Sequence, residues 1–215
     1  MHIVVIGANG RTGRHVVRQA RHDGHRVTAV VRDPGAAELT AGVEIIRADV
    51  VGGADFEFPA GADVVISTLG KNSPRDRTPV CTVGTERVMA AMRRAGIGRL
   101  VATSASPVLR RANGEPFWFR ATVRPIVRWS GRHIYADLED MEHSLRQSDG
   151  VVAWTIVRPG YLVDQPGGAY ELVEESNAMG VVHRADLARA LLDVAGRPHA
   201  AGISYGIASR PEARS

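Results

Sequence analysis

The segment Ile6-Gly7-Ala8-Asn9-Gly10-Arg11-Thr12-Gly13 decides the fold of this chain. It follows the apolar residues 3–6, which we expect to form a β-strand, and it leads into a helical pattern over residues 12–23. Glycines at every third position of such a junction allow a tight turn, close approach of the backbone to a phosphate, and close packing of helix on strand. The N–H groups at the helix N-terminus then provide an anion site.

This context predicts a phosphate loop for a dinucleotide. The residues expected to form it are Gly7, Asn9, Gly10, Arg11, Thr12 and Gly13. The alternative is a glycine-rich turn that merely joins strand to helix. The position of the loop disfavours that alternative, because it is the position that dinucleotide binding requires.

Short β-branched segments alternate with helical patterns along the rest of the chain, which is typical of βαβ units around a buried parallel sheet. Further strands are expected at residues 27–31, 44–47, 64–68, 100–103 and 153–157, and further helices at 82–95 and 135–147. The fold prediction is an α/β, Rossmann-like, doubly wound and mostly parallel sheet with helices on both faces.

After Arg158-Pro159-Gly160 the pattern changes to turns and short elements, with a strand at 170–174, a helix at 185–194 and a strand near 203–207. We expect one domain, 1–215, with a core of about 1–160 and a flexible tail at 210–215. Ligands of open α/β sheets lie beyond the carboxyl ends of the strands. The segment of about 161–209 is therefore expected to pack over that edge and to wall a substrate pocket.

The composition is that of an ordinary globular protein, with 44% hydrophobic and 23% charged residues. The net charge of +4 comes from scattered arginines, so no nucleic-acid partner is expected. Cys81 is the only cysteine, which excludes an intrachain disulfide and favours a cytoplasmic protein. No apolar run approaches the ~20 residues needed to cross a bilayer. Neither a membrane nor a metal site is predicted.

The end of the second strand, Val30-Val31-Arg32-Asp33-Pro34, addresses the choice of cofactor. An NAD site usually has Asp or Glu here to bind the ribose 2′-hydroxyl. Asp33 before a proline is typical of a helix N-cap, which leaves Arg32 to bind a 2′-phosphate, with Arg11 adding charge. NADPH is therefore predicted over NADH. The alternatives are that Arg32 is solvated and that Asp33 reaches the ribose.

Other strand ends should face the same edge. Asp49 and Val50 are expected to flank the adenine, and Thr68, Leu69 and Gly70 to pass close to the ribose and nicotinamide. Pro159, after the sixth strand, completes the expected cofactor contacts. These segments are ordinary loop sequences when taken alone, so the assignment depends on topology as much as on residue type.

Five segments together resemble the atypical short-chain dehydrogenase/reductases. They are the glycine loop, Ser67-Thr68-Leu69-Gly70, Val101-Ala102-Thr103-Ser104-Ala105, Trp154-Thr155-Ile156-Val157-Arg158-Pro159-Gly160 and His183-Arg184-Ala185-Asp186-Leu187-Ala188. The chain is most similar to NAD(P)H-binding proteins of the flavin reductase/biliverdin reductase type and to NmrA-like proteins. The resemblance spans nearly the whole chain. It implies NADPH across the C-terminal edge of the sheet and a substrate pocket under the C-terminal segment.

One departure from better-known members concerns the catalytic pair. Those members have a Tyr with a Lys one helical turn later, and the ammonium lowers the pKa of the phenol. Here Tyr135 is followed by Glu139 at that position, and Lys71 is the only lysine. We expect the carboxylate of Glu139 to raise the pKa of Tyr135. Tyr135 thus remains a weak catalytic candidate, with simple packing as the alternative.

Hydride transfer to a conjugated acceptor needs mainly the two reactants stacked in register. Ser104, just past the fifth strand, is the main catalytic candidate, since its hydroxyl could orient the nicotinamide or relay a proton. The alternative is a hydroxyl bonded to backbone. The function predicted is an NADPH-dependent reductase of a flavin, quinone or other conjugated small molecule. A non-catalytic NmrA-like redox sensor and a sugar-nucleotide epimerase are the alternatives.

Aromatic residues gather in Pro116-Phe117-Trp118-Phe119, followed by Val123, Ile126, Val127 and Trp129. This segment is expected to form a lid over the acceptor or a contact in a homo-oligomer, because large apolar residues in a connecting region commonly mark either. Ordinary packing of an extra helix is the alternative.

Overall fold

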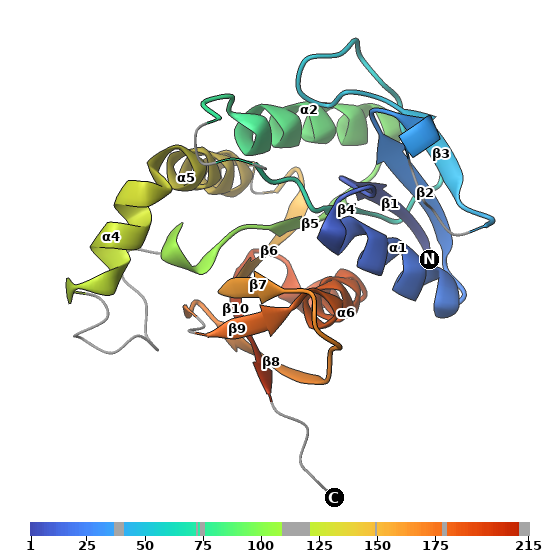
Figure 1. Ribbon diagram of the computed structural model, residues 1–215. Coiled ribbons are helices and arrows are strands. Elements are labelled where there is room, and N and C mark those ends of the chain that lie inside the picture. Colours follow the sequence, from blue (N-terminus) through green and yellow to red (C-terminus); the bar gives the residue numbers. More distant parts are fainter. Residues whose placement is uncertain are drawn as a thin grey trace, which may run out of the picture.

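The computed structural model describes residues 1–36, 41–71, 73, 76–108, 121–148, 150–177 and 180–210. An eight-stranded sheet runs through it in the order β3-β2-β1-β4-β5-β6-β10-β8 (Figure 1). All neighbouring strands are parallel except β8, which is antiparallel to β10. The main strands are β1 His2–Ile6, β2 Arg26–Val31, β3 Glu44–Arg47, β4 Val64–Ser67, β5 Arg99–Thr103, β6 Ala153–Pro159, β8 Ala169–Glu174 and β10 Ile203–Arg210.

Helices cover both faces of the sheet, which confirms the predicted doubly wound, Rossmann-like class. The main helices are α1 Arg11–His22, α2 Val80–Ala95, α4 Val123–Ser130, α5 Arg132–Gln147 and α6 Arg184–Ala195. Short 3-10 turns lie at Pro34–Ala36, Ser106–Val108 and Pro198–Ala200. In Figure 1, α2 and α5 lie along one face, and α1 and α6 along the other.

Alternating side chains of β1 divide the interior into two cores. Ile3 and Val5 belong to the core under α1 and α6, and Val4 and Ile6 to the core under α2 and α5. This is the period of two expected for a strand buried on both faces. The apolar stripe of α5 predicted from its spacing, Leu138, Met141 and Leu145, is buried in the second core.

The C-terminal segment contributes strands to the main sheet, in addition to the pocket-covering role expected of it. β10 pairs in parallel with β6, and β8 pairs with β10, so this segment completes the main sheet. The physical reason is that β6 would otherwise present an unpaired edge. A second, two-stranded sheet, β7 Tyr161–Val163 with β9 Val181–His183, follows directly after the carboxyl end of β6.

Some expectations lie outside the described residues. These are the aromatic segment 116–119 and residues 211–215 of the tail, whereas Arg210 ends β10. Residues 123–130 form the helix α4, on which Ile126 is 67% and Trp129 72% exposed. Among the described helices, none combines the length and hydrophobicity needed to span a membrane.

Candidate functional site

The glycine loop joins β1 to α1 at the carboxyl edge of the sheet. Gly7 has φ 75°, and a side chain there would press on Thr68, with its Cβ 2.9 Å from Thr68 Oγ1. A Cβ on Gly13 would overlap the carbonyl oxygen of Gly7. A Cβ on Gly10 would meet only the Gly7 oxygen, at 3.1 Å. The first and third glycines are therefore required by the fold itself, while Gly10 keeps the outer side of the loop open.

The N-terminus of α1 is free to bind an anion. Its N-cap is Gly10, within the described residues no side chain caps it, and its first turn contains no acidic residue. The first N–H groups of a helix have no partner inside the helix. Arg14 braces the loop instead, donating to Asn9 O at 3.1 Å and to Asn9 Oδ1 at 2.9 Å. These residues fit the pyrophosphate of a dinucleotide.

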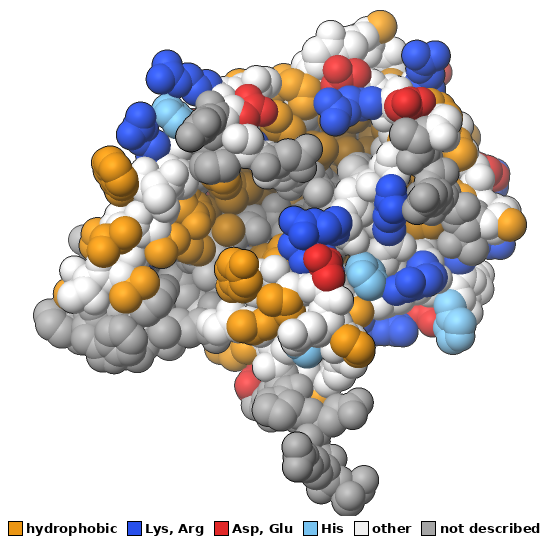
Figure 2. Space-filling view, viewed as in Figure 1, with side chains coloured by type: hydrophobic (Ala, Val, Ile, Leu, Met, Phe, Trp, Pro, Cys, Tyr) orange, Lys and Arg blue, Asp and Glu red, His pale blue; other side chains and the backbone are white. Residues whose placement is uncertain are grey.

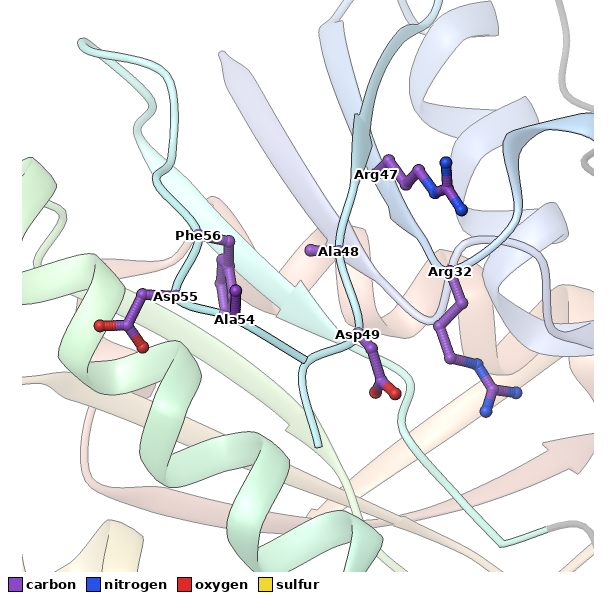
Figure 3. Close-up of a pocket in the computed structure, with 7 residues that line it drawn as sticks. All are labelled: Arg32, Arg47, Ala48, Asp49, Ala54, Asp55 and Phe56. Atoms are coloured by element: carbon purple, nitrogen blue, oxygen red, sulfur yellow. The ribbon is translucent and has the colours of Figure 1, made fainter. Parts of the chain in front are cut away.

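A cavity of about 290 Å³ opens beyond the ends of β2 and β3 (Figure 3). Its lining residues are Arg32, Arg47, Ala48, Asp49, Ala54, Asp55 and Phe56. The structure thus brings together the predicted residues Arg32 and Asp49, and it adds Arg47, which the sequence analysis missed. Knowledge of which residues of β2 and β3 pair would have identified Arg47, because it is the strand partner of Val31.

The carboxylates around this cavity already have partners. Asp33 accepts a hydrogen bond from the Gly35 N–H at 3.0 Å, which confirms its predicted capping position. Asp49 accepts one from the Val51 N–H at 3.0 Å, and this and other backbone bonds hold its pKa below the usual value. In contrast, Arg32 has no hydrogen bond or ion pair with any residue that the structure describes.

Arg11 lies differently from the expectation that it adds charge beside Arg32. Its Nη1 pairs with Asp164 Oδ2 at 3.1 Å, and the other carboxylate oxygen of Asp164 accepts from Arg184 at 2.8 Å. Asp164 directly follows β7, so Arg11 is held toward the small β7–β9 sheet. Arg11 is also absent from the lining of the cavity that contains Arg32. The partner is 153 residues away in sequence, which no local pattern reveals.

The segment after β4, which we predict to pass close to the ribose and nicotinamide, lies against the glycine loop. Thr68 Oγ1 donates to Ile6 O at 2.9 Å and to Gly7 O at 3.2 Å. Leu69 and Val50 both pack on Gly84 of α2, so they shape the wall behind this edge. A Cβ on Gly70 would meet no atom within 4 Å.

Pro159, the remaining predicted cofactor contact, is buried at the end of β6, where its strand partner is Ile207.

Ser104 belongs to a buried polar network. Its hydroxyl donates to Glu142 Oε1 at 2.6 Å. The same carboxylate accepts from Arg158 Nε at 2.9 Å and from Arg158 Nη2 at 2.6 Å, and the Arg158 side chain has no exposed surface. Neither the backbone partner considered for Ser104 nor a free hydroxyl is found. Sequence reasoning missed Glu142, whose only signal was a polar residue on the apolar face of α5.

Tyr135 is half-buried on α5, and its pKa is raised above 10.0. The cause is burial, which corrects our expectation that Glu139 would raise it. Glu139 forms an ion pair with Arg128 of α4. A carboxylate whose charge is matched in this way perturbs its neighbours little.

Lys71 is also unavailable to activate a phenol. Its Nζ lies 3.4 Å from Asp137 Oδ2 and donates to His133 O at 2.8 Å, and the two side chains are 1% and 2% exposed. Asp137 in turn accepts from the N–H groups of Cys81 and Thr82 at the start of α2. The pair therefore ties α2 to α5 and to the segment after β4.

Within the described part of the chain, no group of three His, Cys, Asp or Glu side chains could hold a metal ion. The fold, the uncapped glycine loop and the cavity beside it define an NAD(P)-binding protein of Rossmann type. A model of the family described as NAD(P)H-binding matches residues 7–198. The chain therefore belongs to the NAD(P)H-binding family.

Comparisons with individual proteins agree with this family. The uncharacterized sugar epimerase YhfK of Bacillus subtilis is 28% identical over 200 residues, which cover 89% of this chain and 86% of YhfK. ChuY, an anaerobillin reductase from Escherichia coli O157:H7, has a TM-score of 0.73 at 20% identity over 100% of both chains. A candidate NADH-flavin reductase from Streptococcus pneumoniae has a TM-score of 0.73 at 21% identity, over 98% of this chain and 100% of its own. At such identities the two structures show a shared fold.

Proposed function

We propose that this protein is an NADPH-dependent reductase that transfers a hydride to a flavin, a quinone or another conjugated small molecule. The observation that carries the proposal is that, among the described residues, three charged groups near the catalytic candidates are each held in an ion pair. Lys71 is paired with Asp137, Glu139 with Arg128, and Glu142 with Arg158. A tuned proton donor of the Tyr-Lys kind is absent from this set, which favours a reaction in which the cofactor carries the chemistry.

When bound, a reduced nicotinamide supplies a hydride, which is two electrons and one hydrogen nucleus. The chain's part is to hold and orient the reactants. The first-turn amides of α1 and the glycine loop would bind the pyrophosphate, and Thr68 keeps the segment after β4 against that loop. The proton that completes reduction of the acceptor would come from water, either directly or past Ser104.

Ser104 is the chain's candidate for orienting a reactant. Its proton is donated to Glu142, so its oxygen lone pairs remain to accept a hydrogen bond from an N–H or O–H of a ligand. The bond to Glu142 also fixes the hydroxyl's rotamer. An oxygen held in this way could accept a hydrogen bond from the carboxamide N–H of a nicotinamide. It could equally accept one from a ring N–H of the conjugated molecule that receives the hydride.

The surface beside this edge suits a flat, apolar acceptor. Figure 2 shows hydrophobic side chains over α4 and over β7 and β9, on either side of a hollow in this face. Trp129 of α4 is 72% exposed and Tyr161 of β7 is 75% exposed. The two structural neighbours described above, an anaerobillin reductase and a candidate NADH-flavin reductase, are both named for reduction of a small-molecule acceptor.

The test is to incubate the purified protein with NADPH and a panel of flavins, quinones and linear tetrapyrroles while NADPH absorbance is followed. NADPH deuterated at C4 of the nicotinamide would show whether hydrogen passes directly to the acceptor. The Gly10→Val variant is the matched control, because it should bind no cofactor while keeping its fold. Turnover by the wild type with label transfer supports the proposal.

Tight binding of NADPH without oxidation by any acceptor would instead support a non-catalytic redox sensor. The name of YhfK keeps a sugar-nucleotide epimerase as the other alternative. An epimerase of this fold would interconvert a nucleotide-linked sugar with bound NAD(P) and no net consumption of cofactor. The raised pKa of Tyr135 makes that chemistry harder. To exchange a proton with the sugar, the phenol would need a pKa near neutral pH.

A further inference from the structure

Asp164, which directly follows β7, lies between the first residues of two helices. Its Oδ2 accepts a hydrogen bond from Nη1 of Arg11, the first residue of α1, at 3.1 Å. Its Oδ1 accepts one from Nη1 of Arg184, the first residue of α6, at 2.8 Å. A carboxylate from a distant part of the chain is thus bound at the end of α1 that carries the glycine loop.

The bonds on the two sides of Asp164 differ in how firmly they are held. The Arg184 side chain is 9% exposed, whereas those of Arg11 and Asp164 are 73% and 53% exposed. An ion pair between two exposed side chains contributes little, because water and salt screen it. Arg184 therefore fixes the position of Asp164, and Arg11 can turn to another anion by rotation of its own side chain.

The pyrophosphate of a dinucleotide would bind within reach of Arg11. Arg11 belongs to the first turn of α1, whose backbone N–H groups form the expected anion site. A guanidinium forms stronger hydrogen bonds with a phosphate oxygen than a neutral donor does. A pyrophosphate at the loop and the carboxylate of Asp164 would therefore attract the same guanidinium and, as like charges, repel each other.

We propose that Asp164 lowers the affinity for the dinucleotide by competing with its pyrophosphate for Arg11. This inference rests on the proposed use of a nicotinamide dinucleotide. NADPH and NADH share the pyrophosphate, so Asp164 weakens the binding of both by the same factor and leaves the preference between them unchanged. The weaker binding serves turnover, because a reductase must release the oxidised cofactor in every cycle, and release limits the rate of many enzymes.

The other end of α1 provides a matched control. There, Asp23 Oδ2 lies 2.6 Å from Arg189 Nη1, and this ion pair also joins α1 to α6. Asp23 is the C-cap of α1, so it lies about 18 Å from the glycine loop, the length of twelve helical residues. Asp23→Asn therefore makes the same change of charge between the same two helices, but far from the pyrophosphate.

The experiment measures dissociation constants of NADPH and NADH for the full chain by titration calorimetry. The variants are Asp164→Asn, Arg11→Ala, the double variant and Asp23→Asn. Asp164→Asn should tighten both dinucleotides about fivefold, and Arg11→Ala should weaken both about fivefold. In the Arg11→Ala background, Asp164→Asn should change either dissociation constant by less than about twofold, because the contested guanidinium is gone. Asp23→Asn should stay within about twofold of the wild type.

Unchanged or weaker binding in Asp164→Asn would overturn the proposal. An equal gain in Asp23→Asn, or a full gain in the Arg11→Ala background, would overturn it too, since competition for Arg11 would then not be the cause. These results leave the reductase proposal standing, because turnover with the acceptor panel is measured separately. A wild type that binds neither dinucleotide would defeat both proposals. Circular dichroism checks the fold of each variant, and Asp164→Ser, which also removes the charge, repeats the test if asparagine disturbs it.

Discussion

The two halves of the sheet's carboxyl edge use their charged residues differently. In the half formed by β1–β3, the arginines beside the cavity, Arg32 and Arg47, form no hydrogen bond or ion pair among the described residues, although the charge of Arg32 helps to lower the pKa of Asp49. Within the same residues, no side chain caps the N-terminus of α1. In the half formed by β4–β6 with α4 and α5, the described charged groups nearest the catalytic candidates form ion pairs, as Glu142 does with Arg158.

From this difference we infer that a charged ligand binds over the first half of the edge. Unmatched donors and cations favour a phosphate-bearing ligand over the first half. In the second half, matched charges join helices to the sheet, so they contribute to the fold more than to proton transfer. Substitutions in the first half should therefore affect binding, and substitutions of the paired charged residues in the second half should affect stability.

The largest expected effect is on stability, from Glu142→Leu. Arg158 has no exposed side-chain surface, so the variant would leave a buried guanidinium without its carboxylate. Breaking a buried pair in this way costs about 3–5 kcal/mol of unfolding free energy. Urea denaturation followed by circular dichroism measures it. Asp140→Leu, on the exposed face of the same helix, is the control and should change stability by less than about 1 kcal/mol. Equal losses in the two variants would contradict the comparison.

The next largest effect is on binding, from Gly10→Val. Gly10 has φ −71° and ψ 163°, which valine adopts readily, and its Cβ would approach only Gly7 O. The fold should therefore persist, while the branched side chain stands where the pyrophosphate must approach. We expect NADPH affinity to fall by about 100-fold or more, which is roughly 2.7 kcal/mol. Nucleotide fluorescence measures binding, and retained affinity would disprove the phosphate loop.

A smaller effect is expected from Ser104→Ala. The variant removes one hydrogen bond to Glu142 and leaves both bonds from Arg158 in place, so the fold should survive. Turnover should fall about tenfold, at the low end for a hydroxyl that orients a reactant, with NADPH affinity nearly intact. Steady-state kinetics with whichever acceptor the panel identifies would decide this. Unchanged turnover would remove Ser104 from the reaction.

The smallest effect is expected from Tyr135→Phe. Burial disfavours the charged phenolate and raises the pKa of Tyr135 above 10.0, so the phenol stays protonated from about pH 6 to 9. Ionisation of the phenol should therefore cause no change in kcat/KM as the pH rises through that range. The variant's kcat/KM should fall by less than about threefold. A pH profile of both proteins tests this. A large loss here, with none for Ser104→Ala, would revive a tyrosine-based mechanism.

Much of the fold could be predicted because its signals are local. Gly7 needs a positive φ and Gly13 needs the absence of a side chain, and both requirements arise within the loop itself. The strands β1–β6 and helices α1, α2 and α5 follow from the spacing of apolar residues, with ends displaced by up to three residues at the start of α5. The short β7 and β9 carry too few residues for such a pattern.

The sequence by itself determined the phosphate loop, the doubly wound class and the capping position of Asp33, because each depends on backbone conformation or periodicity over a few residues. Only the tertiary structure decided which charges meet. Arg11 pairs with a residue 153 positions away, and Ser104 with one 38 positions away. Strand order and register set such pairs. The physical reason is that an ion pair forms between whichever side chains the packed elements bring within a few ångströms, and sequence spacing does not encode that distance.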